Sequence, residues 1–386
     1  MSVEVKNIPI VETKIAELFS AAHPFVFDCG KELSPVNVAY ETYGKLNASR
    51  DNAILVCHAL TGSAHAAGFS SDDPTCPPSS GRKSAGWWEP FIGEGRGLDT
   101  SKYFVISSNF LGGCYGTTGS VSPDSKTGKP YGMDFPQMTV RDMVRVQKAL
   151  IDFLGVKKLR TVIGGSLGGM QVLEWALMYP DIVQSIIPIA TASQHSPWCI
   201  GLNDIARQAI MNDPEWRNGD YYNFRQPEKG LSIARQIAMM SYRSDVSFLQ
   251  RFHREKLKTN GESKTARFDP ANLFQVESYL RYQGKKLVER FDANTYLYIT
   301  YAMDLHDVAF GRGEVNEALA SISVPSLNIG IDTDVLYPAH EQREIASHIP
   351  HSTYREIKTP FGHDAFLIEY DQLSKFVREF LALNAL

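Results

Sequence analysis

The chain has 386 residues, of which 43% are hydrophobic and 21% charged, and 39 Lys+Arg against 43 Asp+Glu give a formal net charge of −4. This composition is typical of a globular protein with a large core. The slightly acidic balance and the lack of a long basic tract argue against a nucleic-acid-binding protein. No apolar run approaches the roughly 18 residues that a membrane helix needs.

The chain begins Met-Ser-Val-Glu-Val-Lys, without the basic and apolar regions of a secretory signal, and its five cysteines are widely scattered. We therefore expect a cytoplasmic protein whose thiols stay reduced. No cysteine belongs to a Cys-x-x-Cys pair or stands at ligand spacing from a histidine, so the sequence predicts no metal site. Cys57 and Cys199 are expected to pack as small hydrophobic side chains.

The first half of the chain alternates predicted strands and helices. Residues 36–43 alternate with period two, which predicts a half-exposed strand. Continuous apolar runs predict strands buried on both faces, as in parallel sheets covered by helices, at 53–57, 103–106, 161–163 and 185–189. Helical periodicity covers 140–153 and 168–179. This alternation indicates an α/β protein.

From residue 194 to 315 the pattern changes to helix-like stretches with several Trp and Tyr residues and no clear buried strand. The alternation then returns, with predicted strands and helices at 325–331, 339–349, 352–357 and 371–383. We therefore expect a core formed by residues 1–193 and 316–386, interrupted by a helical cap at 194–315. A loop is expected at 70–86.

The sharpest local signal is a G-x-S-x-G pattern at 164–168, centred on Ser166 and placed between the predicted strand 161–163 and a helical pattern. In a nucleophile elbow the flanking residues must be small, because the strand turns sharply into the helix and lifts the hydroxyl above the sheet. The alternative is a glycine-rich turn whose serine only caps the helix. The strand-turn-helix context favours Ser166 as a nucleophile and the Leu167 amide as an oxyanion donor.

A serine nucleophile needs a general base and an acid that orients it, and in this type of site they follow in the order acid, then histidine. Asp334 lies just past the predicted strand 325–331, and Asp332 is its rival, because order alone cannot separate them. His363 follows the next predicted strand and is the best placed of the ten histidines. Such loops at the carboxyl ends of strands are where an open α/β sheet places its site.

A second oxyanion donor is expected in the loop after an early strand. Residues 58–62, His-Ala-Leu-Thr-Gly, occupy that place, and we assign the donor to the Leu60 amide. His58 is interpreted as a structural histidine.

Within the predicted cap, residues 230–242 form an apolar helical pattern that carries one arginine, Arg235, with Tyr242 two turns later on the same face. A guanidinium in apolar surroundings needs an anion, so this pair suits a substrate carboxylate. From the residues alone, an ion pair with a protein acid is the favoured interpretation. Basic residues that follow could attract a phosphorylated cofactor, although a solvated loop is the favoured interpretation; they are Arg251, Arg254, Lys256, Lys258, Lys264 and Arg267.

Eight stretches together resemble the homoserine O-acetyltransferases of the α/β-hydrolase superfamily, over nearly the whole chain from about residue 20 onward. Several are specific to that family, unlike the bare serine motif. They are His58-Ala59-Leu60-Thr61-Gly62, Gly86-Trp87-Trp88, Asn109-Phe110-Leu111-Gly112-Gly113-Cys114, Pro130-Tyr131-Gly132, Gly164-Gly165-Ser166-Leu167-Gly168-Gly169-Met170-Gln171, Gly219-Asp220-Tyr221-Tyr222, Phe274-Gln275-Val276-Glu277-Ser278-Tyr279 and Gly362-His363-Asp364-Ala365-Phe366-Leu367.

The resemblance implies an α/β-hydrolase fold and an acyl transfer in two halves. Ser166 would be the nucleophile, Asp334 rather than its rival the acid, and His363 the base that takes the Ser166 proton as the hydroxyl attacks the co-substrate acetyl-CoA. The hydroxyl of L-homoserine would then attack the acetyl-serine, with the Leu60 and Leu167 amides stabilising both tetrahedral intermediates. The expected product is O-acetylhomoserine, a methionine precursor, made by a ping-pong scheme without a bound cofactor.

The family's substrate residues fall on Arg235, which would hold the homoserine carboxylate, and Asp364, which would meet its amino group, with Tyr242 and Thr61 completing the pocket. Only the resemblance supports this role for Arg235. The family's usual homodimer would pair through cap helices. Three alternatives share the same triad: a homoserine O-succinyltransferase, a serine O-acyltransferase, and a carboxylesterase-type hydrolase that gives the acyl group to water.

Overall fold

The computed structural model describes residues 11–70, 84–257 and 274–384. The start of the chain and most of the expected loop at 70–86, including Cys76, lie outside the described residues. The same holds for three members of the basic cluster, Lys258, Lys264 and Arg267.

The core is built on one eight-stranded sheet. Its strands lie in the order β1 (Lys14–Leu18), β4 (Val36–Tyr43), β10 (Phe104–Ser108), β5 (Ala53–Cys57), β11 (Leu159–Gly165), β12 (Ile186–Ile189), β13 (Ser326–Ile331) and β14 (Ser352–Ile357). β4 pairs antiparallel with both β1 and β10, whereas every pair from β10 to β14 is parallel. A mostly parallel sheet therefore carries the carboxyl ends of β5, β11 and β13 to one edge.

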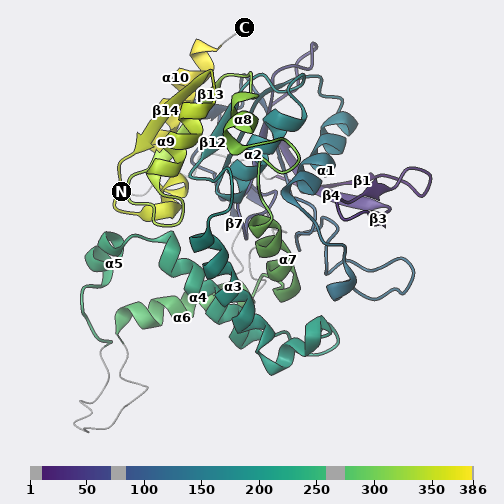
Figure 1. Cartoon of the computed structure of the whole chain (residues 1–386), viewed down its shortest axis with the longest axis vertical. Coiled ribbons are helices and arrows are strands. Elements are labelled where there is room, and N and C mark those ends of the chain that lie inside the picture. The colour runs from purple at the N-terminus through teal and green to yellow at the C-terminus, as the bar shows by residue number, and fades with distance from the viewer. Residues whose placement is uncertain (1–10, 71–83, 258–273, 385–386) are drawn as a thin grey trace.

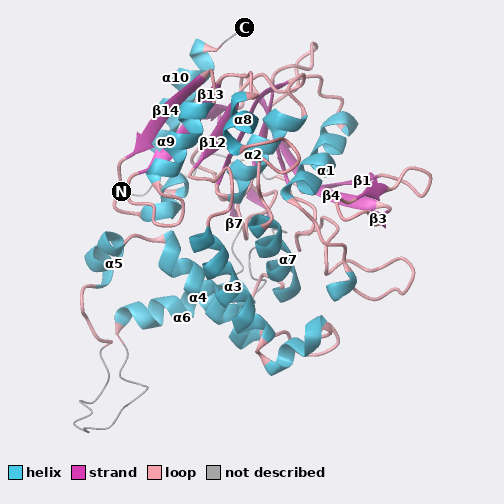
Figure 2. Cartoon of the chain, in the orientation of Figure 1, coloured by secondary structure: helices cyan, strands magenta, loops and turns pink. Residues whose placement is uncertain are grey.

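Helices cover both faces of the sheet, so the strands bury side chains on both sides. In β5, Leu55 and Cys57 enter one hydrophobic core while Ile54 and Val56 enter the other. The first core is completed by α1 (Val140–Phe153), α2 (Leu167–Met178), α8 (Val315–Ala320) and α9 (Ala339–His348), and the second by α10 (Tyr370–Leu383). Figure 2 shows the strands between these helices. The continuous apolar runs of the sequence follow from this double burial.

β4 differs from the sequence-based expectation of a half-exposed strand, because six of its eight residues are buried. The alternation arises from polar residues that the fold satisfies internally. Glu41 is fully buried, and its carboxylate accepts hydrogen bonds from Tyr43 Oη at 2.6 Å and Thr13 Oγ1 at 2.8 Å. Position between two other strands, rather than exposure, therefore sets the environment of β4.

Between β12 and β13 the described residues form a helical layer: α3 (Pro197–Met211), η3 (Pro214–Gly219), α4 (Glu228–Tyr242), α5 (Asp245–Phe252), α6 (Gln275–Val288) and α7 (Ala293–Asp304). α4 packs against α3 and α6. Figure 1 shows these teal and green helices gathered at one end of the sheet. They fall within the predicted cap at 194–315, although the domain limits themselves stay predictions.

The remaining elements are short. Three two-stranded pairs join β2 (Phe25–Val26) to β3 (Glu32–Leu33), β6 (Phe69–Ser70) to β7 (Ser84–Ala85), and β8 (Ile92–Gly93) to β9 (Leu98–Asp99), and 3-10 helices form at η2 (Gly132–Asp134) and η4 (Gly362–Leu367). In the described ranges, no helix has the length and apolar character needed to cross a bilayer. The same ranges hold no group of His, Cys, Asp or Glu side chains arranged to bind a metal ion.

Candidate active site

Ser166 stands at the turn between β11 and α2, with φ 58° and ψ −126°. Such a backbone conformation costs a non-glycine residue on the order of 1–3 kcal/mol, so the surroundings must hold it. The Ser166 amide donates to the Ile189 carbonyl at 2.9 Å, and the Thr191 hydroxyl donates to the Ser166 carbonyl at 2.8 Å. The geometry is that of a nucleophile elbow rather than of a serine that caps its helix, because Ser166 makes no side-chain cap.

Glycines let the elbow press against the neighbouring strand. A Cβ at Gly164 would lie 2.5 Å from the Cys57 carbonyl oxygen, and one at Gly165 would lie 2.7 Å from the Phe366 ring. A Cβ at Gly168 would also collide with the Cys57 carbonyl. The spacing of the motif therefore follows from the close approach of β5 and η4 to the turn.

Asp334 and His363 meet at the edge of the sheet. Asp334 Oδ2 lies 2.7 Å from His363 Nδ1, and Asp334 Oδ1 accepts from the Leu336 and Tyr337 amides at 2.8 and 2.9 Å. Its rival Asp332 instead accepts from the Thr359 amide at 3.0 Å. The structure therefore pairs His363 with Asp334, a choice that chain order alone left open.

The carboxylate of Asp334 also raises the pKa of His363. Burial disfavours the imidazolium, but the charge of Asp334 and its hydrogen bond outweigh burial and raise the pKa of His363. Because an ionised Asp334 only accepts hydrogen bonds, Nδ1 carries the proton and Nε2 is left with its lone pair. Among the described residues, no hydrogen bond joins His363 to the Ser166 hydroxyl; in unliganded sites such bonds are often long.

The two expected oxyanion donors lie on neighbouring segments. Leu167 is the first residue of α2, where backbone amides have no intrahelical acceptor. Leu60 follows β5, and the Gln171 side chain of α2 links the two segments by donating to the His58 carbonyl at 3.4 Å and the Leu167 carbonyl at 3.2 Å. This arrangement places the Leu60 segment beside the elbow.

A narrow cavity of about 400 Å³ opens at Ser166. Core and cap both contribute to its wall, which consists of Leu60, Ser166, His195, Cys199, Leu202, Asn203, Ala206, Ile237, Ala238, Ser241, Tyr242, Tyr296, Met303, Leu336 and Tyr337. The lining is largely apolar and aromatic with a few polar groups, as is typical of small-molecule sites.

Arg235 and Tyr242 meet on α4, as their spacing predicted. The Arg235 guanidinium lies 5.4 Å from the centroid of the Tyr242 ring, and that ring lies 5.8 Å from the His363 ring. In the part of the chain that the structure describes, no ion pair within 4.0 Å includes Arg235, but its charge acts on the carboxyl of Asp364, which is the internal acid nearest to the favoured alternative. The guanidinium therefore lies on the Tyr242 ring without a close carboxylate partner among the described residues.

Asp364 is already engaged by the cap. Its Oδ2 lies 3.1 Å from Arg243 Nε, just past the end of α4. Burial raises the pKa of Asp364, and the charges of Arg243, Arg235 and His363 oppose this rise. Asp364 thus sits between two arginines and the histidine, and an ammonium group would have to share it with Arg243.

Thr61 has a partner that the sequence did not indicate. Arg290, between α6 and α7, donates to the Thr61 carbonyl at 2.8 Å, to its hydroxyl at 3.2 Å and to the Tyr115 hydroxyl at 2.6 Å. Thr61 needs this support, because its φ of 68° is unfavourable for a β-branched residue. The Thr61 hydroxyl keeps its proton for donation, and Arg290 ties the Leu60 segment to the cap.

A buried polar chain also reaches the cavity wall. Tyr337 Oη lies 3.0 Å from His195 Nε2, His195 Nδ1 lies 3.1 Å from Asp304 Oδ1, and Asp304 Oδ2 lies 2.6 Å from Arg207. The Tyr337 ring lies 5.3 Å from the His363 ring, so this chain fixes one wall of the histidine. The sequence could have indicated only Tyr337, because it lies three residues after Asp334. His195, Asp304 and Arg207 come from distant segments of the chain.

His58 fits the structural role expected for it. It is buried, its ring stacks on Phe110 at 4.2 Å, and its Nδ1 lies 2.9 Å from the Ala59 carbonyl oxygen. Burial lowers the pKa of His58 to about 4, so the ring stays neutral. Cys57 and Cys199 are likewise buried, as predicted.

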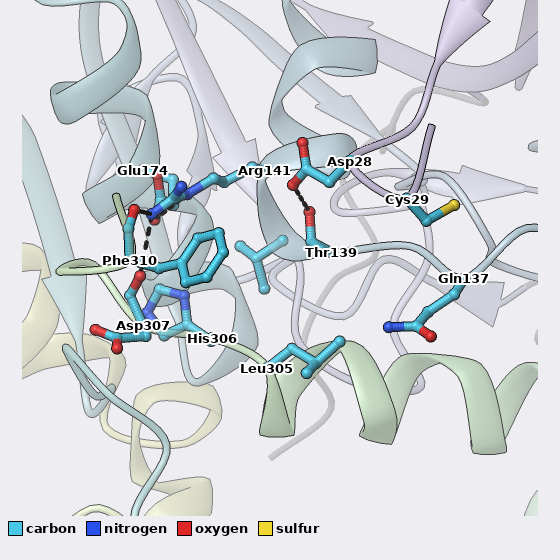
Figure 3. Close-up of a pocket in the computed structure, with 11 residues that line it drawn as sticks. Asp28, Cys29, Gln137, Thr139, Arg141, Glu174, Leu305, His306, Asp307 and Phe310 are labelled. Carbon is cyan, nitrogen blue, oxygen red and sulfur yellow. Dashed lines mark hydrogen bonds and ion pairs between the residues drawn. The ribbon is translucent and has the colours of Figure 1, made fainter. Parts of the chain in front are cut away.

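A larger cavity of about 770 Å³ lies away from Ser166, between α1 and the end of α7. Figure 3 shows how two of its charged side chains are paired: Arg141 donates to Glu174 at 3.3 Å and to the Phe310 carbonyl at 2.7 Å, and Asp28 accepts from Thr139 at 2.6 Å. Among its described lining residues, His306 bonds the Ala192 carbonyl at 3.1 Å rather than the Cys29 thiol, so the chemistry is assigned to the Ser166 cavity.

Comparison with known proteins agrees with this geometry. Residues 52–370 match the model of a family described as alpha/beta hydrolase fold. The chain is 51% identical over 380 residues, 97% of each chain, to a homoserine O-acetyltransferase of Deferribacter desulfuricans. The crystal structure of homoserine O-acetyltransferase from Bacillus anthracis superposes with a TM-score of 0.85 at 30% identity, covering 97% of this chain and 98% of that one. Esterase E22 gives a TM-score of 0.83 at 30% identity, covering 96% and 100%.

The predicted fold class is confirmed by both the family match and the structural neighbours. Identity near one half over almost the whole length is far above what a shared fold alone requires. The chain therefore belongs to the α/β-hydrolase fold family and, within it, to the homoserine O-acetyltransferases.

Proposed function

We propose that this protein transfers the acetyl group of acetyl-CoA to the hydroxyl of L-homoserine, as the names of its relatives indicate. The observation that carries the proposal is the Asp334–His363 pair beside the Ser166 elbow, with Arg235, which has no close ion pair among the described residues, packed on Tyr242 beside the same histidine. The pair and the elbow suit acyl transfer, and the arginine suits an amino-acid acceptor.

In the first half-reaction, Nε2 of His363 accepts the proton of the Ser166 hydroxyl as its oxygen attacks the thioester carbonyl. Asp334 keeps the Nδ1–H tautomer and stabilises the imidazolium that forms. The Leu60 and Leu167 amides donate to the developing oxyanion. The carbon–sulfur bond then breaks, and the thiolate of coenzyme A leaves with the proton held by His363.

In the second half-reaction, the homoserine hydroxyl gives its proton to His363 and attacks the acetyl-serine. Arg235 binds the homoserine carboxylate, and Asp364 accepts from its ammonium group alongside Arg243. Tyr242 and Thr61 border the acceptor. The imidazolium then returns its proton to Ser166 as the ester is released. The departure of coenzyme A before homoserine reacts makes the scheme ping-pong.

The lining of the Ser166 cavity favours an acetyl donor over succinyl. None of the residues that form its wall is Lys or Arg. A succinyl group would bring a second carboxylate to a site where Arg235 is already assigned to the carboxylate of homoserine, and an unpaired buried charge is costly. A methyl group meets the apolar side chains of Leu336 and Met303 without such a penalty.

An esterase is the second candidate, because the structure of esterase E22 resembles this chain almost as closely as that of the Bacillus anthracis acetyltransferase, at the same 30% identity. Both activities use the same serine chemistry, and they differ in whether water or an amino acid accepts the acyl group. Arg235 weighs against the esterase, since water needs no cation for its recognition.

We also propose a cytoplasmic homodimer that pairs through the cap. Supporting it, large apolar side chains are exposed on α3 and α4: Trp198 (61%), Ile205 (56%), Ile233 (49%) and Met240 (54%). Exposed apolar area of this kind is characteristic of an interface between copies. Sedimentation velocity should give the mass of two chains for the wild type and of one chain for Ile205→Asp/Ile233→Asp. A monomeric wild type would contradict the pairing.

The test of function measures coenzyme A release with acetyl-CoA or succinyl-CoA, each with homoserine, serine or no acceptor, and with Ser166→Ala as the inactive control. We expect release that requires homoserine and prefers acetyl-CoA, and an acetyl adduct on Ser166 when the acceptor is withheld. Equal release without an acceptor would identify a hydrolase, and use of succinyl-CoA or serine would change the substrate assignment.

A further inference from the structure

A second, more open cavity lies just beyond the loop that carries His363. It measures about 610 Å³ and lies where α5 and α6 of the cap face the residues before η4. We call it the Arg251 cavity; its wall consists of Arg243, Ser247, Phe248, Gln250, Arg251, Phe252, Tyr279 and Phe361. None of these wall residues is acidic, whereas two are arginines.

The two arginines are in different states. Arg243 pairs with Asp364 at 3.1 Å. Arg251 stacks on aromatic rings instead, at 4.6 Å from the Tyr279 centroid and 5.2 Å from that of Phe252, and no ion pair of the described residues includes it. Stacking leaves the N–H edges of a guanidinium free, and those edges match phosphate oxygens in pairs. Arg251 therefore rests on these rings, and no described residue uses its hydrogen-bonding edge.

Aromatic rings line the cavity beside the Arg251 guanidinium. Phe248, Tyr279 and Phe361 are only partly buried, and all three line the cavity. Partly exposed rings beside a cation form a surface on which a planar heterocyclic base can stack. Arg254 and Lys256 follow α5 and lie over the ring of Phe274, the residue before α6, so they add positive charge to the same edge of the cap. The wall thus combines the two features that a phosphorylated nucleoside requires.

The cavity adjoins the reacting centre. Phe361 lies two residues before His363, and the partner of Arg243 is Asp364, the residue after it. The two segments are in contact, since a Cβ at Gly362 would lie 2.6 Å from the Ser244 amide nitrogen. An acyl-CoA carries its nucleotide at the far end of a long pantetheine arm, and the narrow cavity at Ser166 has no cation for its phosphates. The nucleotide must therefore bind outside that cavity.

We propose that the Arg251 cavity binds the 3′-phosphorylated adenosine diphosphate portion of the acyl-CoA donor, with Arg251 on a phosphate and the aromatic rings on the base. The inference rests on the proposed function, because it assumes a coenzyme A thioester as the donor. The site contributes to donor binding and takes no part in bond making at Ser166.

The test compares two donors that share the thioester and differ in the nucleotide, acetyl-CoA and S-acetylpantetheine, with homoserine as acceptor. Arg251→Ala should raise KM for acetyl-CoA about tenfold to a hundredfold, the loss expected for a charge-assisted hydrogen bond, and leave kcat unchanged. KM for S-acetylpantetheine should stay within twofold. Arg251→Lys should recover part of the loss, and Arg281→Ala, which removes an exposed arginine of α6 outside the wall, should match the wild type.

A binding measurement separates this inference from the proposed function. Calorimetry with adenosine 3′,5′-bisphosphate should show binding to the wild type that Arg251→Ala weakens by a similar factor. Equal KM values for both donors in the wild type, or an equal rise for both in Arg251→Ala, would overturn the site. A wild type that turns over neither donor but binds the bisphosphate through Arg251 would overturn the proposed reaction and leave the nucleotide site standing.

Discussion

Replacing Asp334 by asparagine tests the central pair of the site with little change in shape. Oδ1 of Asp334 accepts from two backbone amides, at 2.8 and 2.9 Å, so the amide oxygen of asparagine must take that position. Its NH2 group then faces Nδ1 of His363, where Oδ2 now lies at 2.7 Å. A donor would meet a donor there, and His363 would move its proton to Nε2. The nitrogen that must accept from Ser166 would then be blocked.

The size of the effect follows from that change of tautomer. The corresponding substitution in a serine protease lowers kcat about 10⁴-fold. We therefore expect kcat to fall about 10³- to 10⁴-fold. Because each tenfold corresponds to about 1.4 kcal/mol, this is a loss of about 4 to 5.5 kcal/mol of transition-state stabilisation. Coenzyme A release with saturating acetyl-CoA and homoserine measures it. Near-wild-type thermal unfolding would show that the fold survives, because the two amide hydrogen bonds are kept.

Asp332→Asn is the matched control. Asp332 accepts from the Thr359 amide at 3.0 Å and lies 3.9 Å from Lys358 Nζ, a solvent-screened contact. We expect kcat within threefold of the wild type. If Asp334→Asn kept more than a tenth of the activity, or if Asp332→Asn lost as much, the assignment of the acid would be wrong.

Three further predictions concern other groups of the site. Arg235→Ala should raise KM for homoserine about a hundredfold, since it removes a charge-assisted pair. Hydrolysis of p-nitrophenyl acetate, which needs no acceptor, should stay unchanged; an equal loss of homoserine acetylation and ester hydrolysis would contradict the role of Arg235. Because the pKa of His363 is raised above 6.5 and only the neutral ring accepts a proton, kcat/KM should fall as pH drops through a midpoint above 6.5. Asp334→Asn should lower that midpoint, since burial is then opposed only by the charge of Asp364, and an unmoved midpoint would refute the coupling. Arg290→Met should lower kcat about tenfold to a hundredfold, because the Leu60 segment loses its anchor at Thr61, and Arg290→Lys should restore part of the rate; unchanged kcat in both would refute the anchoring.

Local sequence patterns predicted most of the strands and helices of the core. The runs at 53–57 and 352–357 and the helix at 140–153 coincide with β5, β14 and α1, because hydrophobic periodicity reflects burial directly. The same rule erred at β4, where its period-two pattern predicted exposure. Buried Glu41 there depends on hydrogen bonds from Thr13 and Tyr43, and a single-strand pattern cannot report partners contributed by other segments.

In the candidate active site, too, some residues were predicted from local sequence and others only from the tertiary structure. The glycines around Ser166 predicted the nucleophile, because the elbow is a local backbone geometry that only small flanking residues allow. The choice of Asp334 over Asp332, the pairing of Asp364 with Arg243, and the Arg290 contact to Thr61 all join positions far apart in the chain. The sequence by itself determined the strand-helix alternation and the nucleophile, since these depend on neighbours in the chain. Only the tertiary structure decided which charges are paired, because a charge is satisfied by whatever the fold brings within a few ångströms of it.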